Sequence, residues 1–124
     1  MKTSTPLTMG VLLVTLALIV ATKTAMAQDQ VKVAPNNTKV LLENDRVRVL
    51  DVQTKPGEKL AMHSHPASLV YSLSSGKTKF TSPDGKTTEV EGKAGGAIWR
   101  EAETHASENV GTTDLHVLII ELKK

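Results

Sequence analysis

Two histidines separated by one residue, His63 and His65, are the side chains of this sequence best suited to chemistry. Alternate side chains of a β-strand point to the same face, so both imidazoles leave the strand in one direction, with Cα atoms about 7 Å apart. That spacing lets both rings reach one metal ion through nitrogen–metal bonds of about 2.1 Å. Pro56 and Gly57 precede the pair and can turn the chain into such a strand.

A third histidine, His105, lies further along the chain, after the turn signal Gly95-Gly96 and a short apolar segment. Three imidazoles from two strands of a small barrel would form an open metal site. A His-x-His pair alone is more often an ordinary polar pair, so the metal hypothesis depends on the third histidine. The competing hypothesis is a barrel without a metal, whose pocket holds a small ligand.

Composition limits the other possibilities. The chain has 124 residues, enough for one domain, and no cysteine, which excludes a disulfide scaffold and any thiolate site. Removing Lys2 and Lys23 with the N-terminal segment leaves 13 basic and 13 acidic side chains, so no basic field remains for nucleic acid. The chain has one Trp, one Tyr and one Phe, too few for a row of stacking aromatics.

The N-terminal segment has the pattern of a signal peptide. Lys2 is followed by the uncharged apolar run 7–21, and Ala25-Met26-Ala27 matches an A-x-A cleavage site. Cleavage after Ala27 predicts an exported mature chain that starts at Gln28, periplasmic or secreted, with no stable membrane insertion. An uncleaved membrane anchor is the alternative, because about 20 apolar residues can span a bilayer.

The rest of the sequence predicts an all-β domain. Residues 28–39 are polar and are expected to form a flexible leader, and residues 40–124 the domain itself. Short alternating or apolar segments with frequent Gly and Pro turns are typical of a barrel or sandwich. The expected strands are 40–42, 46–52, a His-x-His strand ending at Pro66, 68–73, 77–82, 86–91, 97–99, 105–110 and 115–122.

The three histidines belong to two spaced motifs. Gly57-x5-His63-x-His65-x3-Leu69-x6-Gly76 is similar to the first motif of the cupin superfamily, G-x5-H-x-H-x3/4-E-x6-G. The segment from Gly95 through Glu101, Glu103 and His105 to Asn109 is similar to the second, G-x5-P-x-G-x2-H-x3-N. The resemblance implies a double-stranded β-helix, or jelly roll. It also implies a metal site built from the three histidines of these motifs.

The sequence departs from the family pattern at the carboxylate ligand, which falls on Leu69. Leucine cannot bind a metal, and a purely imidazole set suits Zn, Fe, Ni or Cu better than Mn. Glu101 and Glu103 replace the Pro and Gly of the second motif. They are interpreted as solvated charges at the rim, with a replacement-ligand role as the alternative.

Further candidates surround the predicted site. Leu69 and Tyr71 share a strand face and are predicted to line the pocket, although Tyr71 is equally well explained as a packed core residue. Trp99 is interpreted as core or pocket wall, and Asn109 as a turn cap or a support for His105. His116 is interpreted as a hydrogen-bonded core or edge histidine rather than a fourth ligand.

The sequence therefore predicts an exported small cupin that binds one divalent transition metal, Zn, Fe, Ni, Cu or Mn, and a small-molecule ligand. The alternative is a small metal-dependent enzyme, dioxygenase-like or isomerase-like, acting on a small oxygenated substrate, which rests on family resemblance alone. No residue beyond the ligands is assignable to catalysis, so the sequence does not decide whether the protein is an enzyme. A homodimer is left open.

Overall fold

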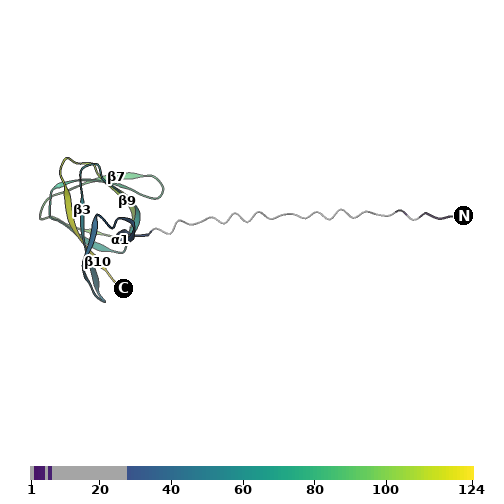
Figure 1. Cartoon of the computed structure of the whole chain (residues 1–124), viewed down its shortest axis with the longest axis horizontal. Helices are drawn as coiled ribbons and strands as arrows, with labels where there is room; N and C mark the ends of the chain where they lie inside the picture. Colours follow the sequence, from purple (N-terminus) through teal and green to yellow (C-terminus); the bar gives the residue numbers. More distant parts are fainter. Residues whose placement is uncertain (1, 5, 7–27) are drawn as a thin grey trace.

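The structure is a computed structural model that describes residues 2–4, 6 and 28–124 (Figure 1). The predicted signal peptide, residues 1–27, lies almost wholly outside the described residues. Among the residues that are described, no helix is long and apolar enough to cross a membrane.

Two packed β-sheets make up the described domain. One sheet has the strand order β1-β4-β9-β6-β7 and the other the order β2-β3-β10-β5-β8. Each strand pairs antiparallel with its neighbours except β1, which runs parallel to β4. The elements are β1 (Gln28–Asp29), α1 (Gln30–Val33), β2 (Thr38–Glu43), β3 (Val47–Thr54), β4 (Lys59–His65), β5 (Ser68–Ser72), β6 (Gly76–Thr81), β7 (Thr87–Gly92), β8 (Ala97–Arg100), β9 (Glu103–Asn109) and β10 (Leu115–Leu122).

The predicted jelly roll is confirmed, because neighbours within each sheet are mostly not neighbours in sequence. The last strand, β10, lies between β3 and β5, as its nearly continuous apolar sequence predicts. The turn at Pro83-Asp84-Gly85 joins β6 and β7 into the predicted hairpin. This strand order places β4 and β9, which carry the two motifs, side by side.

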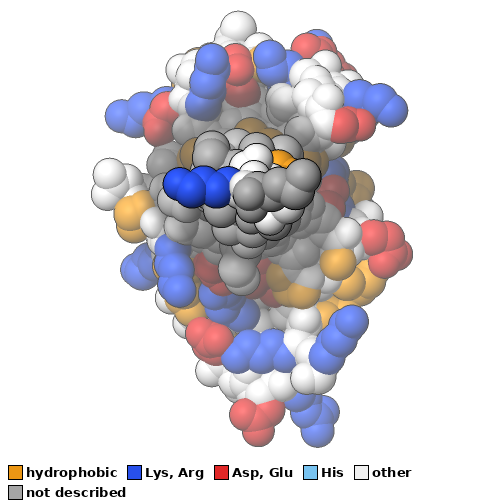
Figure 2. Space-filling model, turned by 90° about the vertical axis from the view of Figure 1, so that its right-hand side faces the viewer, with side chains coloured by type: hydrophobic (Ala, Val, Ile, Leu, Met, Phe, Trp, Pro, Cys, Tyr) orange, Lys and Arg blue, Asp and Glu red, His pale blue; other side chains and the backbone are white. Residues whose placement is uncertain are grey.

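The hydrophobic core lies between the two sheets. Its buried members come from both sheets and from the segment after α1, and they are Ala34, Leu50, Val52, Leu60 and Ile119. On the surface turned to the viewer in Figure 2, Lys and Arg side chains are interspersed with Asp and Glu. This mixture agrees with the balanced charge of the sequence and offers no single-sign field on the visible part of that face.

The structure differs from the predicted flexible leader over residues 28–39. Gln28 and Asp29 pair with β4, and Gln30 begins a helical turn that Asp29 caps through a 2.8 Å bond from the Val31 N–H. Gln30 and Ala34 are 1% and 7% exposed. The polar composition of the segment did not indicate that it packs against the domain. Its polar residues make hydrogen bonds at the edge of the core instead of facing solvent.

Candidate metal centre

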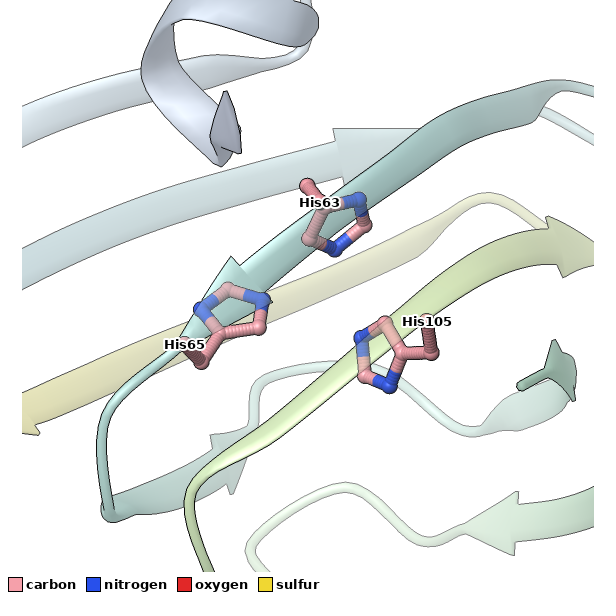
Figure 3. Close-up of side chains that lie close together, drawn as sticks. All are labelled: His63, His65 and His105. Atoms are coloured by element: carbon pink, nitrogen blue, oxygen red, sulfur yellow. The ribbon is translucent and has the colours of Figure 1, made fainter. Parts of the chain in front are cut away.

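The register of β4 against β9 assembles the three histidines. His63 lies directly opposite His105, and both side chains point into the space between the sheets. His65 follows two residues along β4 and therefore points to the same face. Figure 3 shows the three rings converging, two from β4 and one from β9. The prediction that the two motifs meet at one point matches this geometry.

A β-bulge in β4 directs His63 inward. Leu60 pairs with Ser107 and His63 with His105, and the register shifts between these pairs. Leu60 and His63 are both buried although they are three residues apart, which a regular strand does not allow. The extra residue lets one strand supply both a core leucine and an inward histidine.

The three imidazoles form a compact, buried cluster. The exposed fractions of His63, His65 and His105 are 1%, 7% and 6%. One ring nitrogen from each lies within 4.8 Å of the others. Tetrahedral bonds of about 2.1 Å would place ligand nitrogens about 3.4 Å apart, so small side-chain adjustments bring the set to a metal geometry.

Hydrogen bonds set which nitrogen of two rings can bind an ion. His63 Nδ1 lies 2.7 Å from the carbonyl oxygen of Ala61, and His65 Nδ1 lies 2.8 Å from Oε2 of Glu121. A carbonyl and an ionised carboxylate only accept, so both Nδ1 atoms carry the proton and donate. The Nε2 lone pairs of His63 and His65 are therefore free for a metal.

His105 has a buried nitrogen without a hydrogen-bond partner. Its Nδ1 lies 3.2 Å from Oε1 of Glu103, but the two atoms are not aligned as a hydrogen bond. Burial, with smaller contributions from neighbouring charges, lowers the pKa of His105 to about 3. Burial likewise lowers the pKa of His63. Neutral imidazoles and an unpartnered buried nitrogen are what a transition metal site requires, so the residues fit such an ion.

Glu103 lies on the cavity wall opposite His65 but is held by Arg100. Arg100 donates to both carboxylate oxygens, at 2.5 and 2.8 Å, and its guanidinium lies 4.4 Å from the centre of the Phe80 ring. Burial is the largest single influence and opposes ionisation of Glu103, but the hydrogen bonds from Arg100, together with attraction to Arg100 and to the neighbouring histidines, outweigh it and lower the pKa. Glu103 is thus an ionised residue paired with arginine, outside the group of converging ligand atoms.

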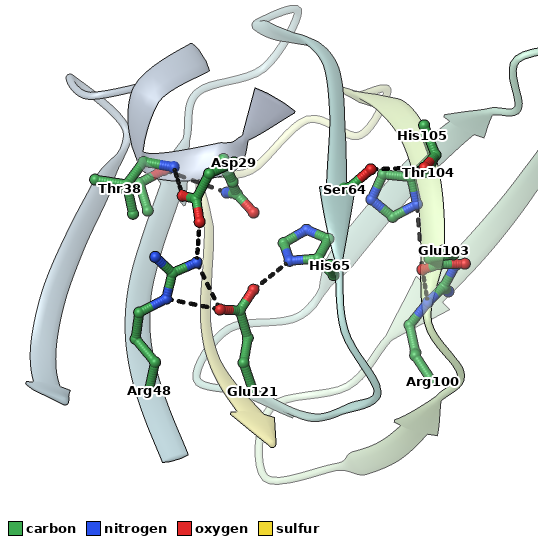
Figure 4. A network of polar contacts seen from close by, with 12 residues as sticks. Asp29, Thr38, Arg48, Ser64, His65, Arg100, Glu103, Thr104, His105 and Glu121 are labelled. Carbon is green, nitrogen blue, oxygen red and sulfur yellow. Dashed lines mark hydrogen bonds and ion pairs between the residues drawn. The ribbon is translucent and has the colours of Figure 1, made fainter. Parts of the chain in front are cut away.

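Behind His65, a chain of charged groups leads to the N-terminal segment. Glu121 on β10 accepts from Arg48 Nε at 2.7 Å, and Arg48 Nη2 also lies 2.6 Å from Oδ2 of Asp29 (Figure 4). Burial is the largest single influence and opposes ionisation of Asp29, but the hydrogen bonds from Arg48 and from the Val31 N–H, together with the charge of Arg48, outweigh it and lower the pKa of this carboxyl. These three residues were not among the predicted site residues.

Part of the predicted pocket wall faces the other way. Leu69, Tyr71 and Trp99 are 39%, 37% and 51% exposed, and none of them lines the cavity. On β5 the inward positions are instead Ser68, Val70 and Ser72. A shift of one residue exchanges the two faces of a strand, so the prediction for Leu69 and Tyr71 is wrong by one position. The longer spacing of the first cupin motif puts the family carboxylate on Val70.

Asn109 and His116 have structural contacts. Asn109 lines the cavity, donates to the carbonyls of Thr54 and Thr113 at 3.0 and 2.9 Å, and accepts from the Gly111 N–H at 3.0 Å. It therefore fixes the turn after β9, one of its two predicted roles. His116 lies 2.8 Å from Asp51 and is not part of the metal cluster, which agrees with its interpretation as a hydrogen-bonded edge histidine.

A cavity of about 120 Å³ adjoins the histidines between the sheets. Gln30 lies on its wall, and its Oε1 is buried without a partner, while its Nε2 donates to Thr38 at 3.2 Å. Among the described residues, Gln30 Oε1 and His105 Nδ1 are the buried side-chain atoms that lack a partner, and both residues line this cavity. Buried polar atoms without a protein partner are commonly satisfied by water, an ion or a ligand.

Solved structures resemble this arrangement of strands. A cupin domain protein from Bordetella pertussis is 25% identical over 70% of this chain and 92% of that one, with a TM-score of 0.65. A double-stranded β-helix protein of the RmlC-like cupin family from Methanocaldococcus jannaschii is 14% identical over 69% and 78%, with a TM-score of 0.56. The chain has the cupin fold. This confirms the resemblance that the paired motifs indicated.

A cupin superfamily protein from Desulfitobacterium hafniense is similar as well, at 19% identity over 70% of this chain and 76% of that one, with a TM-score of 0.54. No family model matches the sequence, and no curated protein matches it. At these identities the comparisons establish the fold, and the chemistry of this chain has to be argued from its own residues.

Proposed function

We propose that this chain is an exported cupin that binds one divalent transition metal through His63, His65 and His105 and holds a small molecule beside the ion. The observation that carries the proposal is the cluster of three buried imidazoles whose ligand atoms lie within 4.8 Å of one another. Two of the rings have their Nδ1 protons engaged elsewhere, which directs Nε2 to a common point.

The donor set favours particular metals. Three neutral imidazoles without a carboxylate suit Zn, Fe, Ni or Cu better than Mn. Val70 occupies the inward position on β5 where the family pattern would allow a carboxylate, and Glu103 is engaged by Arg100. The ion would supply Lewis acidity, and three protein ligands would leave coordination positions open.

The cavity supports binding of a small molecule. Its volume of about 120 Å³ corresponds to roughly ten water-sized groups at about 10–15 Å³ each. Gln30 Oε1 offers an acceptor for a hydroxyl or amide donor of the ligand. Apolar side chains, among them Val52, Phe80 and Ile119, form much of the remaining wall. A compact molecule with one or two polar groups fits this description.

Elemental analysis of the mature, untagged protein tests the metal proposal. We expect about one equivalent of a single transition metal per chain after purification without chelator. Less than a tenth of an equivalent, both as isolated and after reconstitution, would reject the metal and leave an organic ligand as the occupant of the cavity.

Export is tested separately by the intact mass of protein isolated from its native host. Because β1 begins at Gln28, a cut after Ala27 would leave the described domain whole. We expect a chain that starts at Gln28, in the periplasm of a source with two membranes or in the medium otherwise. Retention of residues 1–27 would contradict cleavage, and membrane fractionation would then test the anchor.

A metal-dependent enzyme is the second candidate, because the cavity provides space for a substrate beside the open coordination positions. Oxygen uptake or turnover with a panel of catechols, enediols and thiols by the metal-loaded protein would favour the enzyme. Saturable binding without turnover would favour the binding protein.

A further inference from the structure

The chain of charged groups behind His65 runs from the ligand to the surface without a break. Arg48 and Glu121 lie directly opposite each other on β3 and β10. Glu121 is 2% exposed and uses one oxygen for Arg48 and the other for His65. Arg48 then reaches Asp29, whose side chain is 34% exposed. Figure 4 shows these contacts in sequence, from the N-terminal segment inward.

Each member of this chain fixes the next. A buried carboxylate is costly unless it is paired, and Arg48 supplies the counter-charge for Glu121. Arg48 is itself held by two carboxylates, one on each side. Glu121 in turn accepts the Nδ1 proton of His65 at 2.8 Å, which selects the tautomer with a free Nε2 lone pair.

We propose that Asp29, Arg48 and Glu121 are positioning residues that hold His65 in the metal-binding tautomer and orientation. The short N-terminal segment before the barrel is thereby a functional part of the metal site. Three contacts link Asp29 to His65, through Arg48 and Glu121. Asp29 also pairs with Ser64, the residue between His63 and His65, where β1 runs beside β4. The inference rests on the proposed metal function, because it assigns a role toward that ion.

Glu121→Gln is the most direct variant. The amide is nearly isosteric, but it presents either its oxygen to Arg48 and its NH₂ to His65, or the reverse. In the first arrangement the NH₂ donates to Nδ1 and moves the ring proton to Nε2, which blocks the metal ligand. In the second, the NH₂ faces Arg48 and that contact is lost. We expect the metal dissociation constant to rise 10- to 100-fold, the usual effect of removing such a partner.

Asp29→Asn is the second variant and keeps the fold. Asparagine caps a helix as well as aspartate, so α1 retains its first-turn hydrogen bond while Arg48 loses a counter-charge. We expect a rise of the dissociation constant of about threefold to tenfold, because the effect reaches the ion through Arg48 and Glu121. Glu91→Gln is the matched control. Glu91 lies on β7, at the far edge of the sheet that carries the histidines, and pairs with Lys77 at 3.6 Å.

Nitrogen-15 NMR of the histidine side chains in metal-free protein reads the tautomer without any ion. We expect His65 to be protonated on Nδ1 in the parent and in Glu91→Gln, and to lose that preference in folded Glu121→Gln. A parent His65 protonated on Nε2 would overturn the inference. So would unchanged metal affinity in both Glu121→Gln and Asp29→Asn. If Glu121→Gln does not fold, Asp29→Asn alone decides. A parent that binds no metal but has the Nδ1 tautomer would reject the proposed function and not the geometry.

Discussion

Two of the three clustered histidines, His63 and His105, are neutral at neutral pH because they are buried. Burial lowers the pKa of His63, and it lowers that of His105 from 6.5 to about 3. Neither ring must release a proton before an ion binds at pH 7, so competition between protons and metal begins at lower pH for these two than for exposed histidines.

The same shifts predict how the metal-free protein responds to acid. Between the ordinary histidine pKa of 6.5 and the folded value of about 3 for His105, the unfolded chain binds more protons than the folded chain. Stability therefore falls as pH drops through this window, by at most about 1.4 kcal/mol per pH unit for each such histidine.

Urea unfolding of the metal-free chain at pH 7 and pH 5 measures this effect, and this range limits interference from carboxyl groups. His105→Asn removes one titrating ring and should make the loss between the two pH values smaller. Equal losses in the parent and in this variant would contradict the lowered pKa of His105.

Val70 and Leu69 give a second prediction at the residue scale. Val70→Glu places a carboxylate on the cavity wall, whereas Leu69→Glu places one on the outer face of the same strand. We expect Val70→Glu to raise the affinity for Mn²⁺ relative to Zn²⁺ by about tenfold, since a hard oxygen ligand suits Mn²⁺. Competition titrations measure the ratio. A change in Leu69→Glu with none in Val70→Glu would restore the original alignment of the motif.

At the scale of elements, the site depends on how β4 enters the barrel. Gly57 precedes this strand with a φ of +83°, and a Cβ added there would meet nothing within 4 Å. The need for glycine is thus one of backbone conformation and not of space. An L-residue with a Cβ costs about 1–2 kcal/mol in this region, and asparagine costs less than most.

Gly57→Ala should therefore destabilise the protein by about 1 kcal/mol or somewhat more, and Gly57→Asn by less. Chemical denaturation of the two variants beside the parent gives the comparison. Equal stability of the alanine variant and the parent would show that the turn relaxes to another conformation.

Element by element, the sequence predicted more of the fold than of the site's surroundings. The bounds of β10 match the expected strand, because eight nearly apolar residues between turns admit little else. The His-x-His spacing predicted two inward rings because strand alternation is a strict rule. The face of β5 could not be predicted, since apolar residues occupy both of its faces and Pro66 leaves the register open.

The sequence analysis did not predict the residues that contact His65 from behind, although the sequence contains one signal for them. Glu121 is the lone acidic residue of β10 and shares its face with Ile119 and Leu115. An acidic residue at a core position of an apolar strand indicates a buried partner. That the partner is Arg48, followed by Asp29, depends on pairing between strands far apart in sequence, which no local pattern specifies.

At the scale of the whole molecule, Leu69 and Trp99, which were predicted to line the pocket, belong to an apolar row on the outer face of the second sheet. Cross-strand pairing aligns Leu42, Val49, Ile120, Leu69 and Trp99 in one row across all five strands of that sheet. Leu42 and Trp99 are each 51% exposed. A continuous apolar row of this kind on a charged surface is typical of an interaction surface.

We propose a second copy of the chain as the partner of this row, since an isologous contact buries the same patch twice. Sedimentation equilibrium should show a dimer for the parent and a monomer for Leu69→Lys and Trp99→Lys. Thr87→Lys, which adds the same charge at an exposed position of β7, should remain dimeric. Weak dimers have dissociation constants of up to about 100 micromolar. A parent that is still monomeric at about this concentration would reject the dimer.

The central claim is that three histidines hold one ion, and isothermal titration with Zn²⁺ tests it most directly when two histidine variants are compared. His105→Ala removes a member of the cluster, whereas His116→Ala removes a histidine of similar character that pairs with Asp51 outside it. We expect one tight site in the parent and in His116→Ala, and at least a hundredfold weaker binding, about 2.7 kcal/mol, in His105→Ala. Equal affinity of the two variants, or loss of binding in His116→Ala with retention in His105→Ala, would contradict the account.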